Sequence, residues 1–163
     1  MSDLSAVATE TLTVPASVDE AYALVADVPR STAHFVGLEQ IRHRGEQDWT
    51  WTLEKLGMAS VSLQAVYTCR YTLDPAARVV RWSAAGLPGD NGSVEGRWTV
   101  TPHGSGARLV LENRLTLHLG ARIPRLMRGA AEKLVARENS RLVGLYVANI
   151  QQTLSGGDGR VRR

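Results

Sequence analysis

Residues 124–154 read PRLMRGAAEKLVARENSRLVGLYVANIQQTL, and this stretch decides the fold. Proline is tolerated at a helix start, and no further proline follows before the glycine pair at 156–157. The stretch therefore predicts one long helix of about 45 Å, weakened locally at Gly129 and Gly144. Its predicted buried face carries apolar residues at helical spacing, namely Met127, Ala131, Leu134, Leu142 and Leu145.

Glu138 lies in the middle of that apolar face, where a carboxylate needs a partner, a ligand or water. Two structural interpretations are an ion pair with Arg141, three residues on, and a helix rotation that brings Glu138 to a cavity rim. Two functional ones are contact with a ligand hydroxyl or carbonyl, and a general base whose pKa burial raises. The second half of the helix adds apolar residues on the opposite side, which predicts cover by the rest of the chain or by a second subunit: Val143, Val147, Ile150 and Leu154.

Composition is that of an ordinary globular protein, with 163 residues, 44% of them hydrophobic and 21% charged. We expect one domain over residues 1–154 and a disordered basic tail over 155–163. The single cysteine, Cys69, excludes an internal disulfide, and we expect it to be a buried, inert thiol. We expect no metal and no cofactor. No segment reaches the roughly 18 apolar residues of a membrane span and no signal-peptide core precedes residue 10, so we expect a cytoplasmic protein.

The chain before the long helix predicts a strand, two short helices and then strands only. Thr9–Val14 alternates as a first strand, and residues 17–20 (Ser-Val-Asp-Glu) form a capping box that opens a helix ending near Pro29. A second short helix follows to Phe35. Period-two alternation then predicts strands over residues 38–44, 49–54, 60–72, 78–84, 93–101 and 108–119, with the cleanest alternation at 60–72.

The last two strands predict which face of the sheet meets water. Pairing across the turn at 102–106 would place Glu112 near Arg97 and Arg114 near Glu95, so the charged face points outward. The inward face is rich in aromatic residues, which either pack as a core or line a cavity: Trp49, Trp51, Tyr67, Tyr71, Trp82 and Trp98. Asn113 interrupts the inward leucines and must be hydrogen-bonded if it is buried.

This layout, together with residues 13–22 (TVPASVDEAY) leading to Asp27 and the strand GRWTV at 96–100, resembles the START/Bet v 1-like superfamily. Within it the chain is most similar to the polyketide cyclase/dehydrase and coenzyme Q-binding branch. The resemblance implies an α+β helix-grip fold, in which a curved seven-stranded antiparallel sheet wraps around the long C-terminal helix. It also implies a hydrophobic ligand between sheet and helix. Some members catalyse aromatisation or cyclisation, and others only carry or sense their ligand.

These observations favour a binding or carrier protein for a small hydrophobic ligand such as a lipid, a quinone or a polyketide. The expected ligand contacts are Trp49, Trp51, Tyr67, Tyr71, Trp82, Trp98, Asn113, Met127, Leu134 and Glu138. The alternative is a cyclase or aromatase that uses Glu138, His34 and Tyr67 or Tyr71 for acid–base chemistry. A third is an interaction module, since the arginines that open the helix suit an anionic membrane surface: Arg122, Arg125 and Arg128. We expect no nucleic-acid partner, and either a monomer or a homodimer.

Overall fold

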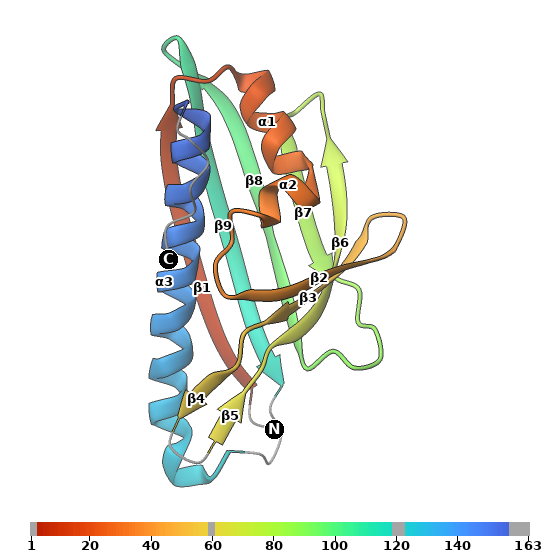
Figure 1. Ribbon diagram of the computed structural model, residues 1–163, viewed down its shortest axis with the longest axis vertical. Helices are drawn as coiled ribbons and strands as arrows, with labels where there is room; N and C mark the ends of the chain where they lie inside the picture. Colours follow the sequence, from red (N-terminus) through yellow and green to blue (C-terminus); the bar gives the residue numbers. More distant parts are fainter. Residues whose placement is uncertain (1–2, 59–60, 119–122, 157–163) are drawn as a thin grey trace.

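A seven-stranded antiparallel sheet lies against one long helix in the computed structural model, which describes residues 3–58, 61–118 and 123–156 (Figure 1). The sheet order is β1-β9-β8-β7-β6-β3-β2. Its strands are β1 (Asp3–Val14), β2 (Leu38–Gly45), β3 (Asp48–Leu53), β6 (Val66–Asp74), β7 (Val79–Ala84), β8 (Gly92–His103) and β9 (Gly106–His118). The helices are α1 (Val18–Ala26), α2 (Val28–Thr32) and α3 (Arg128–Leu154), the last preceded by the 3-10 turn η2 (Arg125–Met127). The predicted helix-grip fold is confirmed.

The first short helix begins where the sequence predicts a capping box, and the second begins at a cap that the sequence analysis did not predict. The Ser17 hydroxyl accepts a hydrogen bond from the Glu20 amide at 3.1 Å, as a capping box requires. Asp27 ends α1 and caps α2, because its carboxylate accepts from the Arg30 amide at 3.1 Å. In Figure 1, α1 and α2 lie together over one end of the sheet, beside the upper part of α3.

The charged outer face of the sheet has the predicted register. Glu95 lies opposite Arg114 and Arg97 lies opposite Glu112, and both pairs form ion pairs. On the other face of the same two strands, Trp98, Leu109 and Leu111 are buried. The alternating polar and apolar residues of β8 and β9 therefore form one solvent-exposed face and one buried face, as expected of an antiparallel sheet covered on one side.

Two strand predictions were wrong. Residues 60–72 do not form one strand, because β5 (Val61–Leu63) pairs with β4 (Leu56–Met58) in a separate hairpin and β6 begins at Val66. Between β5 and β6, the Asn91 side chain makes hydrogen bonds that a neighbouring strand would otherwise make. Its Nδ2 donates to the Gln64 carbonyl at 2.6 Å, and its Oδ1 accepts from the Val66 amide at 2.8 Å. The first strand also begins at Asp3 rather than Thr9, since β1 pairs with β9 along its whole length.

The buried face of α3 is rotated from the predicted one. Its buried residues are Ala131, Val135, Val143, Tyr146, Val147, Asn149 and Ile150, whereas Leu134, Leu142 and Leu145 are only half-buried. The rotation leaves the carboxylate of Glu138 at an edge rather than under the sheet, which avoids the cost of burying its charge. In the second half, Val143, Val147 and Ile150 are covered within the chain, where α3 packs along β1.

The C-terminal end of α3 closes at Ser155, whose amide donates to the Gln151 carbonyl at 3.0 Å. The predicted basic tail lies, from residue 157 on, outside the described residues, as do Arg122 and Leu119. None of the helices in the described segments combines the length and the hydropathy that a membrane span needs.

Candidate functional site: a cavity between sheet and helix

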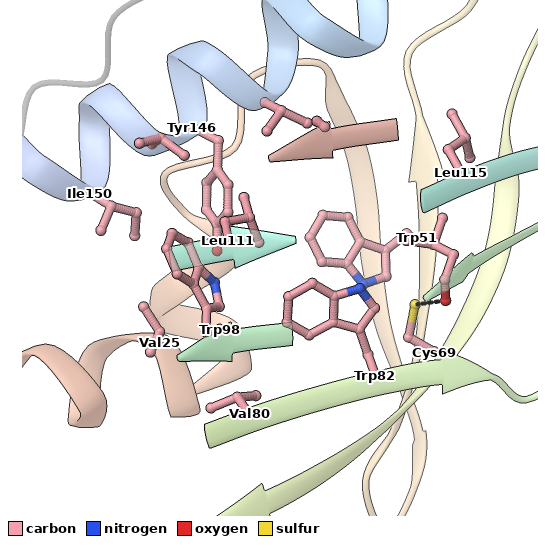
Figure 2. Packing of buried hydrophobic residues seen from close by; sticks show 14 of the residues in the cluster. Val25, Trp51, Cys69, Val80, Trp82, Trp98, Leu111, Leu115, Tyr146 and Ile150 are labelled. Atoms are coloured by element: carbon pink, nitrogen blue, oxygen red, sulfur yellow. Dashed lines mark hydrogen bonds between the residues drawn. The ribbon is translucent and has the colours of Figure 1, made fainter. Parts of the chain in front are cut away.

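A cavity of about 350 Å³ lies between the inner face of the sheet and α3. Figure 2 shows part of its wall, where Trp51, Trp82, Trp98 and Tyr146 gather between the strands and the helix. Every layer of the fold contributes side chains, including Val25 of α1, Ser31 of α2, Tyr67 of β6, Leu111 of β9 and Val135 of α3. The space is therefore a product of the whole fold rather than of one loop.

The aromatic rings of the wall pack against each other. Trp51 stacks on Tyr67 with ring centroids 5.9 Å apart, and Phe35 meets Trp51 edge-on at 5.5 Å. Tyr71 lies 6.0 Å from the Trp82 ring on the next strand. These offset and edge-on contacts are the favourable geometries for aromatic pairs, so the wall is a rigid apolar surface.

The predicted ligand contacts divide into two groups. The cavity lining includes Trp51, Tyr67, Tyr71, Trp82, Trp98, Asn113 and Glu138. Three others lie elsewhere: Trp49 packs on His43 with centroids 4.5 Å apart, Met127 belongs to the turn before α3, and Leu134 is half-buried on the flank of that helix. Strand alternation separated two faces correctly, but it cannot say how far along each strand the cavity extends.

Asn113 is half-buried, and its side-chain amide is hydrogen-bonded. Its Oδ1 accepts from the Trp82 indole nitrogen at 3.1 Å. Asn113 is on β9 and Trp82 is on β7, and both lie opposite Gly96 of the intervening strand β8. The hydrogen bond therefore passes over Gly96, which has no side chain to block it. The Trp82 ring lies over this gap: an ideal Cβ at Gly96 would be 2.9 Å from its Cζ2 atom.

Glu138 stands at the opening of the cavity rather than inside it. The charged residues of the described lining are Glu54, Lys55, Glu138 and Arg141, and all four retain exposed surface. Arg141 Nε donates to Glu138 Oε2 at 3.0 Å, and this bond lowers the pKa of the carboxyl. The interpretation as an ion pair on the cavity rim is confirmed. The proposed general base with a raised pKa was wrong, because the arginine outweighs desolvation.

His34 serves as a link between helices. One ring nitrogen, Nδ1, lies 2.8 Å from the Arg30 carbonyl, and the other, Nε2, lies 2.8 Å from the Thr153 hydroxyl near the end of α3. The Asn149 amide of α3 donates to the His34 carbonyl at 3.1 Å. His34 is not among the cavity-lining residues, so its polar atoms hold the short helices to α3.

Ser31 and Tyr146 are cavity residues that the sequence reasoning missed. Their hydroxyls are hydrogen-bonded to each other across the top of the cavity, and both side chains are buried. Burial raises the pKa of Tyr146. The ring also packs against Phe35 and Trp98, at 5.6 and 5.9 Å. Val135, Leu142 and Tyr146 are spaced so that they lie on one face of the helix. The sequence therefore indicated Tyr146 as a buried residue, but the face predicted to be buried was the neighbouring one.

Replacing Ser31 with alanine is expected to destabilise the protein by about 1 to 3 kcal/mol, because the Tyr146 hydroxyl would lose its buried partner. Removing both hydroxyls, in Ser31→Ala/Tyr146→Phe, should cost less than the two single changes added together. Urea unfolding of the four proteins measures this coupling. Strict additivity would contradict it.

The thiol of Cys69 lines the cavity and stays inert, as predicted. It is 1% exposed and its Sγ lies 3.8 Å from the Val94 carbonyl, toward which it donates (Figure 2). Burial raises the pKa of this thiol far above its ordinary value, so the thiolate does not form at neutral pH. Among the described residues, no group of His, Cys, Asp and Glu side chains is arranged to hold a metal ion.

The family model for polyketide cyclases/dehydrases and lipid transport matches residues 5–148, which include the whole cavity lining. The chain belongs to this family. No curated protein matches it. The family covers the sheet, the short helices and most of α3, so the predicted resemblance to the START/Bet v 1-like superfamily is confirmed.

Solved structures share the fold of this family member at low sequence identity. Zhui aromatase/cyclase from a Streptomyces species aligns with a TM-score of 0.60 and 23% identity, over 94% of this chain and 99% of that chain. A START superfamily protein from Mycobacterium smegmatis gives 0.60 and 14%, over 91% and 99%. A conserved protein from Geobacillus kaustophilus gives 0.57 and 19%, over 93% and 95%.

Proposed function

We propose that this chain binds a small hydrophobic ligand, of lipid, quinone or polyketide type, and carries it in the cavity between sheet and α3. The observation that carries the proposal is the cavity itself. Its aromatic and aliphatic wall encloses about 350 Å³, within the usual range of small-molecule sites, and its charged residues lie at the opening. Membership of a family described by lipid transport as well as cyclisation supports it.

Native mass spectrometry of the purified protein tests the proposal, since a carrier is expected to retain an apolar molecule. Titration with quinones, fatty acids and aromatic polyketides should change the fluorescence of the cavity tryptophans Trp51, Trp82 and Trp98. A protein that retains nothing, and whose fluorescence ignores all three ligand classes, would contradict a carrier function.

The second candidate is a cyclase or aromatase, which the tyrosine hydroxyls in the cavity favour as proton donors. A protein of the same fold is described as an aromatase/cyclase. Glu138 and His34 do not support this function as acid–base groups, because one is held by Arg141 and the other links two helices. Turnover of a poly-β-keto substrate by the purified protein would establish it.

Replacement of Glu138 by glutamine is expected to leave any such turnover unchanged and to destabilise the fold by at most about 1 kcal/mol at neutral pH. The bond to Arg141 lowers the folded-state pKa of Glu138, so its contribution is present above the unfolded value of about 4.3 and is lost as the pH falls through the folded value. Wild type and variant should therefore converge in stability at acid pH. Urea unfolding across pH 3–7 measures the difference in stability between wild type and variant. The control is Glu132→Gln, which removes the carboxylate that pairs with Arg128 on the same helix. A loss of turnover in a stable Glu138→Gln variant would restore Glu138 as a catalytic candidate.

Contact with an anionic membrane stays a prediction, as does the choice between monomer and homodimer. At the start of the long helix, Leu126 is 99% exposed beside the exposed Arg125, whereas Arg128 is already paired with Glu132. Binding to anionic vesicles that does not respond to salt would count against an electrostatic contact there.

A further inference from the structure

Two tyrosine hydroxyls lie inside the cavity, and among the described residues only Tyr71 has a polar protein group next to its oxygen, the Trp51 indole. Tyr67 and Tyr71 are 5% and 9% exposed and both line the cavity. Neither hydroxyl is among the unpartnered polar atoms that protein atoms fully enclose, which are Tyr22 Oη, Trp51 Nε1, Asn139 Nδ2 and Gln152 Oε1. The two hydroxyls therefore open onto the cavity space and are available to whatever fills it.

The neighbouring polar groups make this part of the cavity a source of donors. Desolvation by burial raises the pKa of Tyr67 and of Tyr71, which keeps both hydroxyls protonated. The indole N–H of Trp51, next to the Tyr71 oxygen, only partly offsets this rise in the pKa of Tyr71. Asn113 adds two amide N–H donors, while its carbonyl oxygen accepts from Trp82.

The inner wall also carries no charge that could hold an ionised ligand. Among the described lining residues, the charged side chains are Glu54, Lys55, Glu138 and Arg141; all lie at the opening, where Arg141 is bonded to Glu138. A carboxylate taken past the opening would lose its hydration without meeting a cation. Such burial of an uncompensated charge is strongly unfavourable.

We propose that the cavity selects neutral ligands that carry a carbonyl oxygen in their buried part, and that the Tyr67 and Tyr71 hydroxyls are the residues that recognise this oxygen. The inference rests on the proposed ligand-binding function. A hydrocarbon of the same shape would displace water from both hydroxyls and leave them without a partner, whereas a carbonyl replaces the bonds that the water made. The hydroxyls thus determine specificity, while the aromatic wall supplies most of the affinity.

Three bicyclic probes of nearly equal size separate these contributions: α-tetralone, tetralin and tetralin carboxylate. Calorimetric titration of the wild-type protein near neutral pH is expected to show α-tetralone binding about tenfold more tightly than tetralin, and the carboxylate binding more weakly than the ketone. This comparison needs no variant, so it does not depend on whether a substituted protein folds.

Tyrosines inside and outside the cavity provide a matched set of variants. Tyr67→Phe and Tyr71→Phe each remove a hydroxyl inside the cavity, and each should reduce the preference for ketone over hydrocarbon several-fold with little change in tetralin affinity. Tyr22→Phe removes a buried hydroxyl that does not line the cavity, so it should leave the preference unchanged. Thermal unfolding of each variant shows that the comparison is made on folded protein.

The outcomes distinguish this inference from the function on which it rests. If tetralin binds as tightly as α-tetralone, or the carboxylate binds most tightly, selection of a neutral carbonyl is overturned while the carrier function stands. If the preference exists but survives in both Tyr67→Phe and Tyr71→Phe, the assignment of these two residues is overturned. If no probe binds and no apolar molecule co-purifies, the carrier function fails, and this inference with it.

Discussion

Replacement of Gly96 by alanine is expected to destabilise the protein by about 3 kcal/mol or more, which is a large share of the stability of a domain this size. A Cβ at this position would lie 2.1 Å from the Glu112 carbonyl oxygen and 2.9 Å from the Trp82 ring. The first contact is with the backbone of the neighbouring strand β9, which cannot move without disturbing the sheet. The second would push the indole away from Asn113 and into the cavity.

Urea unfolding measures this effect, and Gly129→Ala is the matched control. Apart from its chain neighbours and the adjacent helix backbone, no heavy atom lies within 4 Å of a Cβ built at Gly129, which sits in the first turn of α3. Alanine there should stabilise the helix by up to about 1 kcal/mol. A Gly96→Ala variant that unfolds at the same urea concentration as the wild type would show that the sheet can relax around this position.

Replacement of Ala65 by phenylalanine is expected to weaken ligand binding by about 100-fold while the protein stays folded. Ala65 is a buried residue of the cavity wall, and its backbone carbonyl accepts from the Leu53 amide at 2.9 Å, so a larger side chain would project into the cavity from a fixed backbone. The phenyl ring would occupy space that the ligand needs, and it would meet apolar neighbours, so its burial is favourable.

The control is Thr72→Phe, which adds an aromatic ring on the exposed face of β6. That variant should bind like the wild type. The measurement is the amount of co-purifying molecule together with calorimetric affinity, and thermal unfolding verifies the fold. Full ligand occupancy in a folded Ala65→Phe protein would place the binding site outside this cavity.

The Gly96→Ala and Ala65→Phe predictions test two different properties of the cavity wall: how it is built and how much space it leaves. Gly96 lets a tryptophan lie across the sheet and bond to Asn113, which completes the wall. Ala65 leaves space in front of the wall. A binding site needs both, since a surface without space is a core and a space without a rigid surface is not selective.

The sequence predicted much of the architecture because local signals and periodicity agreed. The capping box at Ser17, the alternation of β8 and β9, and the opposite charges of Arg97 and Glu112 each pointed to the observed structure. It also predicted much of the cavity lining, since inward aromatic residues such as Trp51 and Tyr67 must line either a core or a cavity.

Periodicity could not show where a regular strand is interrupted or how a helix is rotated. The alternation from Val61 to Tyr71 continues through the break between β5 and β6, because the side chain of Asn91, distant in sequence, takes over the backbone bonds there. In α3, apolar residues occur on more than one side, so spacing alone allowed two faces. Packing along β1 and the ion pair of Glu138 decided between them.

The sequence by itself determined the order of the elements, the wet and dry faces of the sheet and the need for a partner at Glu138 and Asn113. These follow from hydrophobic patterning and from the cost of burying unpaired polar groups, which act on any chain with this pattern. Only the tertiary structure decided which polar groups were satisfied within the protein, as Tyr146 is by Ser31, and which, like the Tyr67 and Tyr71 hydroxyls, face the cavity. The reason is physical: hydrogen bonds depend on distances of about 3 Å between residues that are far apart in the chain.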